Sequence, residues 1–142
     1  MTPTTTAQPI TQSALRNIEA FNAADWNNLK DVLASDVVYL DVPSERRLEG
    51  IGQFLEEYQN WKKVAPDCKG TIKNTFVAGN TAIVEVEWRG TQTGALLDHP
   101  PTGKIWNVKG CQVITMQNDK IKELHQYYDM STMFRQLGIT TK

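Results

Sequence analysis

Apolar and polar residues alternate over much of the second half of the chain. In residues 81–89, Ala82, Val84, Val86 and Trp88 alternate with glutamate and arginine. This period of two predicts a β-strand with one buried and one solvent-facing side. Further strands are predicted at residues 69–78, 104–116 and 121–128. Long strands in succession indicate a sheet curved enough to enclose a pocket.

Helical spacing dominates the first part of the chain. Apolar residues recur every three to four positions in residues 11–23, 26–34 and 51–64, which predicts three helices. A fourth, short helix is predicted at residues 131–137, where Gly138 is suited to end it.

The order of these elements defines a fold class. One short β-branched strand, residues 37–42, lies between the second and third helices, and the four long strands follow the third. Helices followed by a run of antiparallel strands indicate an α+β fold. We expect a strongly bent antiparallel sheet wrapped around the N-terminal helices, with an internal apolar pocket.

The length of 142 residues is most simply one domain. We assign residues 11–142 to it and expect residues 1–10, which are polar with two prolines, to form a flexible arm. A domain of this size buries roughly 68–70% of its unfolded surface, which is enough for a core and a pocket.

Charge and composition limit which kinds of partner the protein is expected to bind. The 15 basic and 16 acidic residues give no basic excess, so we expect no nucleic acid. No apolar run approaches the roughly 18 residues of a membrane span, and residues 1–9 lack signal-peptide features, so we expect a cytoplasmic protein. Cys68 and Cys111 lack metal-ligand spacing, and we expect neither metal nor cofactor. Cys111 reads as a small core residue.

Asp41 is the first candidate for chemistry. It ends the short apolar strand and shares a face with Tyr39, because side chains two apart in a strand point the same way. A solvated strand end, or a cap on the following loop, would explain it. An apolar pocket could instead make it a general base. Both readings stay open from the residues alone.

The two histidines have weaker signals. His99 lies in a proline-rich loop that could cover the mouth of the pocket, or it could be exposed. His125 neighbours Gln126 in a predicted strand, so the two should face opposite sides.

Three segments resemble one family. They are residues 21–26, residues 90–94 together with 100–104, and residues 119–138. In this order they are similar to the SnoaL-like polyketide (ester) cyclases, within the nuclear transport factor 2-like and ketosteroid isomerase-like superfamily. The resemblance implies a cone-shaped fold and covers residues 13–138.

The catalytic residues of these families carry over in part. The SnoaL-like cyclases use an aspartate on the last strand, and the matching position here is Gln126, which cannot shuttle a proton. Asp129 matches a second acid and reads as a helix cap. In ketosteroid isomerase-like proteins, an aspartate that corresponds to Asp41 is the base, and the oxyanion donors fall near Asn17 and Cys111.

Three functions therefore stay open. The first is a cofactor-free enzyme of cyclase, isomerase or lyase type on a small apolar carbonyl compound, with Asp41 as base and Asn17 and Gln126 orienting the substrate. The second is a ligand-binding protein, and the third is an interaction domain. We expect a homodimer through the outer sheet face. The expected ligand-binding residues are Tyr39, Trp61, Trp88, Trp106, Tyr128 and His99.

Overall fold

The computed structural model describes residues 4–139, with side chains from Thr11 onward. Helix α1 (Thr4–Ala23) begins earlier than the predicted start near Thr11. It therefore covers most of the stretch expected to be a flexible arm, and residues 1–3 of that stretch lie outside the described part.

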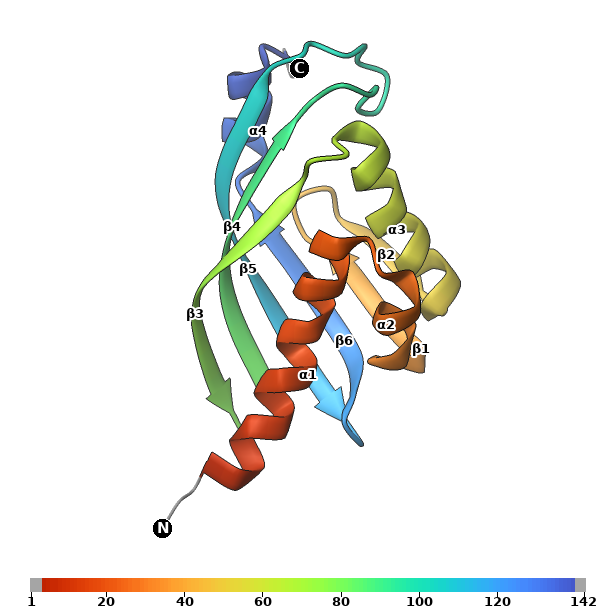
Figure 1. Ribbon diagram of the computed structural model, residues 1–142, viewed down its shortest axis with the longest axis vertical. Helices are drawn as coiled ribbons and strands as arrows, with labels where there is room; N and C mark the ends of the chain where they lie inside the picture. The colour runs from red at the N-terminus through yellow and green to blue at the C-terminus, as the bar shows by residue number, and fades with distance from the viewer. Residues whose placement is uncertain (1–3, 140–142) are drawn as a thin grey trace.

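Six strands form a single curved sheet in the order β2-β1-β6-β5-β4-β3 (Figure 1). All neighbouring pairs are antiparallel except β1 and β6, which run parallel. The bounds are β1 (Leu33–Asp41), β2 (Arg46–Glu49), β3 (Lys69–Ala78), β4 (Thr81–Thr91), β5 (Ile105–Gln117) and β6 (Lys120–Tyr128). The predicted α+β fold is confirmed, and the parallel pair places the first and the last long segments side by side.

Helices cover one face of the sheet. Figure 1 shows α1, α2 (Trp26–Asp31) and α3 (Gly50–Val64) on the concave side, while α4 (Met130–Leu137) packs against β5. The apolar stripe of α1 meets α3 and β4 through Phe21, whose ring lies edge-on to Tyr58 at 5.0 Å and to Trp88 at 5.6 Å. The core is therefore the layer between these helices and the sheet.

The element around Asp41 differs most from the prediction. Helix α2 ends at Asp31 and β1 begins at Leu33, so the first strand is longer than the predicted residues 37–42. The charged residues 44–49, for which no strand is predicted, contain β2, which pairs antiparallel with the end of β1. Its sequence, Arg-Arg-Leu-Glu, is mostly exposed at the sheet edge and has no apolar alternation to reveal a strand.

The indole rings of Trp88 and Trp106 pack directly against glycines of the sheet. A Cβ added at Gly70 would lie 2.7 Å from the Trp88 ring, and one at Gly90 would lie 2.7 Å from Trp106. The glycines in β3 and β4 therefore let the strands pass close beneath these rings.

The outer face of the sheet stays open to solvent. It exposes the large apolar side chains Phe76, Ile105 and Tyr127. The expected homodimer through this face remains a prediction.

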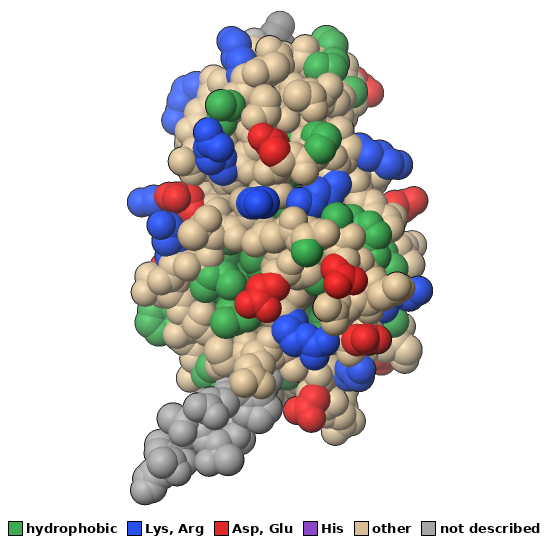
Figure 2. Space-filling model, viewed as in Figure 1, with side chains coloured by type: hydrophobic (Ala, Val, Ile, Leu, Met, Phe, Trp, Pro, Cys, Tyr) green, Lys and Arg blue, Asp and Glu red, His purple; other side chains and the backbone are tan. Residues whose placement is uncertain are grey.

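On the face of the molecule that Figure 2 shows, basic and acidic side chains are interspersed, with apolar ones in small patches. No helix within residues 4–139 is both long and apolar enough to cross a membrane.

Gly94 joins the loop after β4 to the end of α3, and its replacement should test that contact. Its N–H donates to Val64 O at 2.9 Å, and an added Cβ would lie 2.1 Å from the Lys63 carbonyl oxygen. Gly94→Ala should lower the free energy of unfolding by about 1–3 kcal/mol, because the backbone must separate. Urea denaturation measures this change.

Gly52→Ala is the matched control within α3. No atom lies within 4 Å of a Cβ added there. Alanine at this first-turn position should stabilise the protein by about 0.4–1 kcal/mol, because it reduces the conformational freedom of the unfolded chain. Equal effects of the two substitutions would contradict the close contact at Gly94.

Candidate functional site

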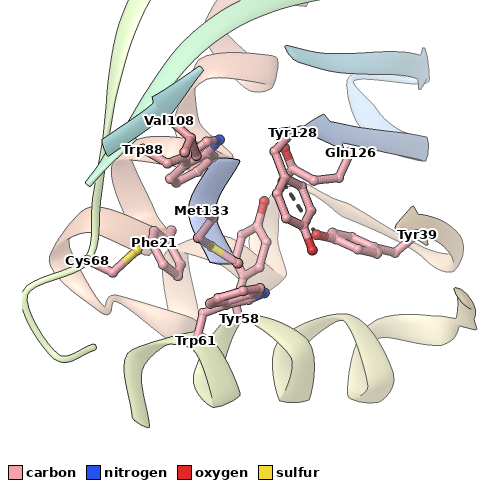
Figure 3. Close-up of a pocket in the computed structure, with 10 residues that line it drawn as sticks. All are labelled: Phe21, Tyr39, Tyr58, Trp61, Cys68, Trp88, Val108, Gln126, Tyr128 and Met133. Carbon is pink, nitrogen blue, oxygen red and sulfur yellow. Dashed lines mark hydrogen bonds between the residues drawn. The ribbon is translucent and has the colours of Figure 1, made fainter. Parts of the chain in front are cut away.

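A cavity opens between the concave face of the sheet and helices α1 and α3. Figure 3 shows Tyr58 and Trp61 rising from α3 toward the side chains of the strands. The interior volume is about 50 Å³, and the empty space amounts to about 460 Å³ when the open solvent at the mouth is included. A single water needs about 10–15 Å³ on the smaller measure, so a ligand larger than a few waters must extend into the mouth. The lining residues are Phe21, Tyr39, Tyr58, Trp61, Cys68, Trp88, Val108, Gln126, Tyr128 and Met133.

Asp41 lies behind this wall at the end of β1, with no exposed surface. The parallel register pairs it with Gln126, which brings it beside Tyr128, two residues further along β6. The Tyr128 hydroxyl donates to Asp41 Oδ2 at 3.3 Å, and the Ser44 N–H donates to Oδ1 at 3.2 Å. Since Tyr128 lines the cavity and Asp41 does not, the carboxylate reaches the cavity through that hydroxyl.

A second buried carboxylate stands next to the first. Glu57 in α3 accepts from Arg46 Nη2 at 2.8 Å and from the Trp61 indole N–H at 3.1 Å. The same guanidinium nitrogen lies 3.6 Å from Asp41 Oδ2. Arg46 therefore contacts both acids with a single positive charge, closer to Glu57 than to Asp41. Trp61 connects this charged cluster to the cavity wall.

Sequence reasoning missed Glu57 and Arg46, although one signal was present. Glu57 is three residues after Phe54 and four before Trp61, on the apolar stripe of its helix. A glutamate inside such a stripe needs a buried partner. The sequence did not show that Arg46 would supply it, because β2 was not predicted.

A buried polar network holds Tyr58, another residue of the cavity wall. The Tyr58 hydroxyl donates to Asn17 Oδ1 at 2.5 Å, and Gln112 Nε2 donates to the Tyr58 oxygen at 3.2 Å. Asn17 Nδ2 donates to Gln112 Oε1 at 3.1 Å and to Ala14 O at 2.6 Å. The amide of Asn17 is thus fully used, and any effect of Asn17 on a ligand must pass through Tyr58.

The inward position on β5 is Gln112 rather than Cys111. Gln112 is fully buried within the network, whereas Cys111 lies half-buried on the outer side of the strand. The expectation that Cys111 is a core residue is wrong, because Val108, Gln112 and Ile114 set the alternation of β5.

Burial keeps the hydroxyls of the wall protonated. Burial raises the pKa of Tyr39, Tyr58 and Tyr128 above the ordinary tyrosine value, and the charges of Asp41 and Glu57 add to this for Tyr128. Burial lowers the pKa of Arg46, but its hydrogen bond and attraction to Glu57 outweigh this, so the pKa is raised overall. The site is therefore rich in O–H donors beside a fixed cation.

Gln126 points into the cavity from β6, and its Nε2 donates to the Tyr39 hydroxyl at 3.4 Å (Figure 3). Four of the six residues expected to bind a ligand also line the cavity, namely Tyr39, Trp61, Trp88 and Tyr128.

Trp106 and His99 lie elsewhere. Trp106 is buried behind Trp61, with ring centroids 6.0 Å apart, and His99 packs beside Phe134 at 6.1 Å. Cys68 lines the cavity, but burial raises the pKa of its thiol to about 12, so it is protonated near neutral pH. Within residues 4–139, no three His, Cys, Asp or Glu residues gather as metal ligands.

Residues 11–137 match the SnoaL-like polyketide cyclases as a family. The chain belongs to this family. The resemblance inferred from the three sequence segments is therefore confirmed. No curated protein matches the sequence.

Solved structures share the SnoaL-like fold at low identity. A candidate SnoaL-like polyketide cyclase from Jannaschia sp. CCS1 superposes with a TM-score of 0.87 at 18% identity, over 99% of this chain and 98% of that one. IdmH, a candidate polyketide cyclase from Streptomyces antibioticus, has a TM-score of 0.80 at 22% identity, over 92% and 99%. A protein from Catenulispora acidiphila with a ketosteroid isomerase-like fold has a TM-score of 0.78 at 19% identity, over 90% and 93%.

Proposed function

We propose that this SnoaL-like protein is a cofactor-free acid–base enzyme acting on a small, mostly apolar carbonyl compound. The observation that supports this most directly is Asp41, a fully buried carboxylate that accepts a hydrogen bond from Tyr128 on the cavity wall. A buried acid linked to an aromatic cavity by one hydroxyl can take up a proton from a bound molecule.

The proposed step moves a proton from the carbon beside the carbonyl group. As the C–H bond breaks, the proton passes to the Tyr128 oxygen while the hydroxyl proton of Tyr128 passes to Asp41 Oδ2. The electron pair forms the enolate. The raised pKa of Tyr128 favours this relay over a free phenolate, because burial and the nearby carboxylates disfavour negative charge on the ring oxygen.

Tyr39 can stabilise the enolate oxygen. Its hydroxyl oxygen accepts from Gln126, and its own proton is directed to no partner within residues 4–139. A buried O–H aimed at a developing oxyanion stabilises charge where it forms, and such a donor typically contributes about 10²–10³ in rate.

A binding protein without catalysis is the second candidate. Two observations favour it: a guanidinium nitrogen of Arg46 already lies 3.6 Å from Asp41, and Gln126 occupies the position where the family resemblance places an acid. A carboxylate held by a cation is a weaker base than a free one in the same setting.

Exchange of α-protons separates the two candidates without knowledge of the natural substrate. Small cyclic and aromatic ketones are incubated with the protein in D₂O, and NMR measures the loss of the α-proton signal. Wild-type protein should accelerate the exchange of at least one ketone, and Tyr128→Phe should slow it by about 10², the low end for acid–base groups.

Tyr127→Phe is the matched control. Tyr127 is the neighbouring residue on β6, but its ring is exposed on the outer face, so its loss should leave exchange unchanged. If ketones bind, as measured by tryptophan fluorescence, and none exchanges faster than in buffer, the binding-protein candidate replaces the enzyme.

A further inference from the structure

The side-chain oxygen of Gln126 is a buried acceptor that no group of the protein satisfies. The residue is only 6% exposed. Among the buried side-chain nitrogen and oxygen atoms in the described part of the chain, Gln126 Oε1 is the one without a hydrogen-bond partner. An unpaired buried acceptor costs free energy, so proteins retain few of them, and each needs a physical reason.

The surroundings show where this oxygen can find a partner. Gln126 lines the cavity, and its Nε2 donates to the Tyr39 hydroxyl oxygen at 3.4 Å. Because the amide is planar and its two ends share one carbon, the oxygen is turned away from the Tyr39 hydroxyl. One side of the cavity therefore offers an acceptor, Gln126 Oε1, close to a donor, the Tyr39 O–H.

The rest of the wall supplies no comparable acceptor. Phe21, Val108 and Met133 have no side-chain acceptor, and the indole of Trp88 can only donate. The hydroxyl oxygens of Tyr58 and Tyr128, which donate to Asn17 and Asp41, are weaker acceptors than an amide oxygen. A ligand that buries an O–H or N–H in this cavity can thus satisfy it at Gln126.

We propose that the cavity selects ligands carrying a hydroxyl or N–H group beside their carbonyl, with Gln126 Oε1 as the specificity-determining acceptor. That the ligand has a carbonyl group rests on the proposed function. That it has a hydroxyl or N–H group rests on Gln126 alone. The ligand class is a small cyclic hydroxycarbonyl or phenolic compound: its ring meets the aromatic wall, its carbonyl meets Tyr39 and its hydroxyl meets Gln126.

Phenol and anisole test the donor directly. They share one ring, and anisole replaces the O–H by a methyl ether. Binding is followed by the fluorescence of Trp61 and Trp88, which line the cavity. Wild-type protein should bind phenol about 5- to 100-fold more tightly than anisole, since anisole leaves the buried acceptor unpaired.

Gln126→Met removes the acceptor and keeps the length of the side chain. The preference for phenol should disappear. The thermal midpoint should rise by about 2–4 °C, because an unpaired polar atom has left the interior. A residue kept only for structure would show the opposite change in midpoint.

Gln112→Met is the matched control. Gln112 is equally buried, but its amide is satisfied by Asn17 and Tyr58 and does not line the cavity. This variant should lower the midpoint and keep the preference for phenol.

Four results would overturn the proposal. They are equal binding of phenol and anisole to wild type, no phenol binding up to its solubility limit, a preference that survives Gln126→Met, and a lower midpoint in that variant. These titrations do not depend on turnover. If no ketone exchanges faster than in buffer, the proposed enzymatic function is therefore rejected, while the preference for hydrogen-bond donors can still hold.

Discussion

Replacing Asp41 by asparagine is expected to reduce α-proton exchange by about 10³, within the range for loss of an acid–base group. Asparagine has nearly the same shape but cannot accept the proton that Tyr128 passes on. It keeps an oxygen for the Ser44 N–H, which lies 3.2 Å from Asp41 Oδ1. Initial rates measured by NMR on the best ketone of the panel give the ratio.

The fold of this variant should stay intact. Arg46 keeps Glu57 as its partner at 2.8 Å when the charge on Asp41 is gone. The free energy of unfolding should therefore change by no more than about 1 kcal/mol, the value of a typical hydrogen bond. Full exchange activity in a folded Asp41→Asn variant would show that the carboxylate is not the base, and the relay would have to be abandoned.

The sequence predicted the architecture well because burial leaves a periodic trace. Alternation in residues 81–89 and helical spacing in residues 51–64 correspond to β4 and α3. The sequence predicted the secondary structure less well where side chains are exposed or charged. Strand β2 has four mostly exposed residues and no periodicity, so the partner that Arg46 supplies to the buried acids was invisible.

The candidate site depends on pairings between distant segments. That Asp41 ends a strand was readable locally. Its contact with Tyr128, which is 87 residues away in the sequence, follows from the parallel pairing of β1 with β6. Nothing in the local pattern specifies which strand becomes the neighbour of β1.

On β5, the predicted inward residue was wrong by one position. Matching the resemblance placed an oxyanion position at Cys111, but neighbouring residues on a strand face opposite sides. The structure turns Gln112 inward to hold Tyr58 and Asn17. Over the whole strand, Trp106, Val108, Ile114 and Met116 lie on the same side as Gln112, and this longer alternation would have indicated the register.

Arg46→Met should be the most destabilising single change at the site. The side chains of Asp41 and Glu57 are 1% and 5% exposed, and in the described part of the chain Arg46 is the one cation within 4.0 Å of either. Removing the partner of a buried charge costs about 3–5 kcal/mol. Because the Arg46 side chain is itself 49% exposed, water can reach the pair, and we expect a loss of about 3 kcal/mol, the low end of that range.

Arg47→Met separates this effect from the general loss of a surface arginine. Arg47 is the next residue on β2, and its ion pair with Glu49 joins side chains that are 57% and 68% exposed. Such surface pairs contribute about 0–1 kcal/mol. Urea denaturation of both variants should give a difference of at least about 2 kcal/mol between Arg46→Met and Arg47→Met. Similar values would mean that Arg46 stabilises the two buried carboxylates no more than an ordinary surface ion pair does.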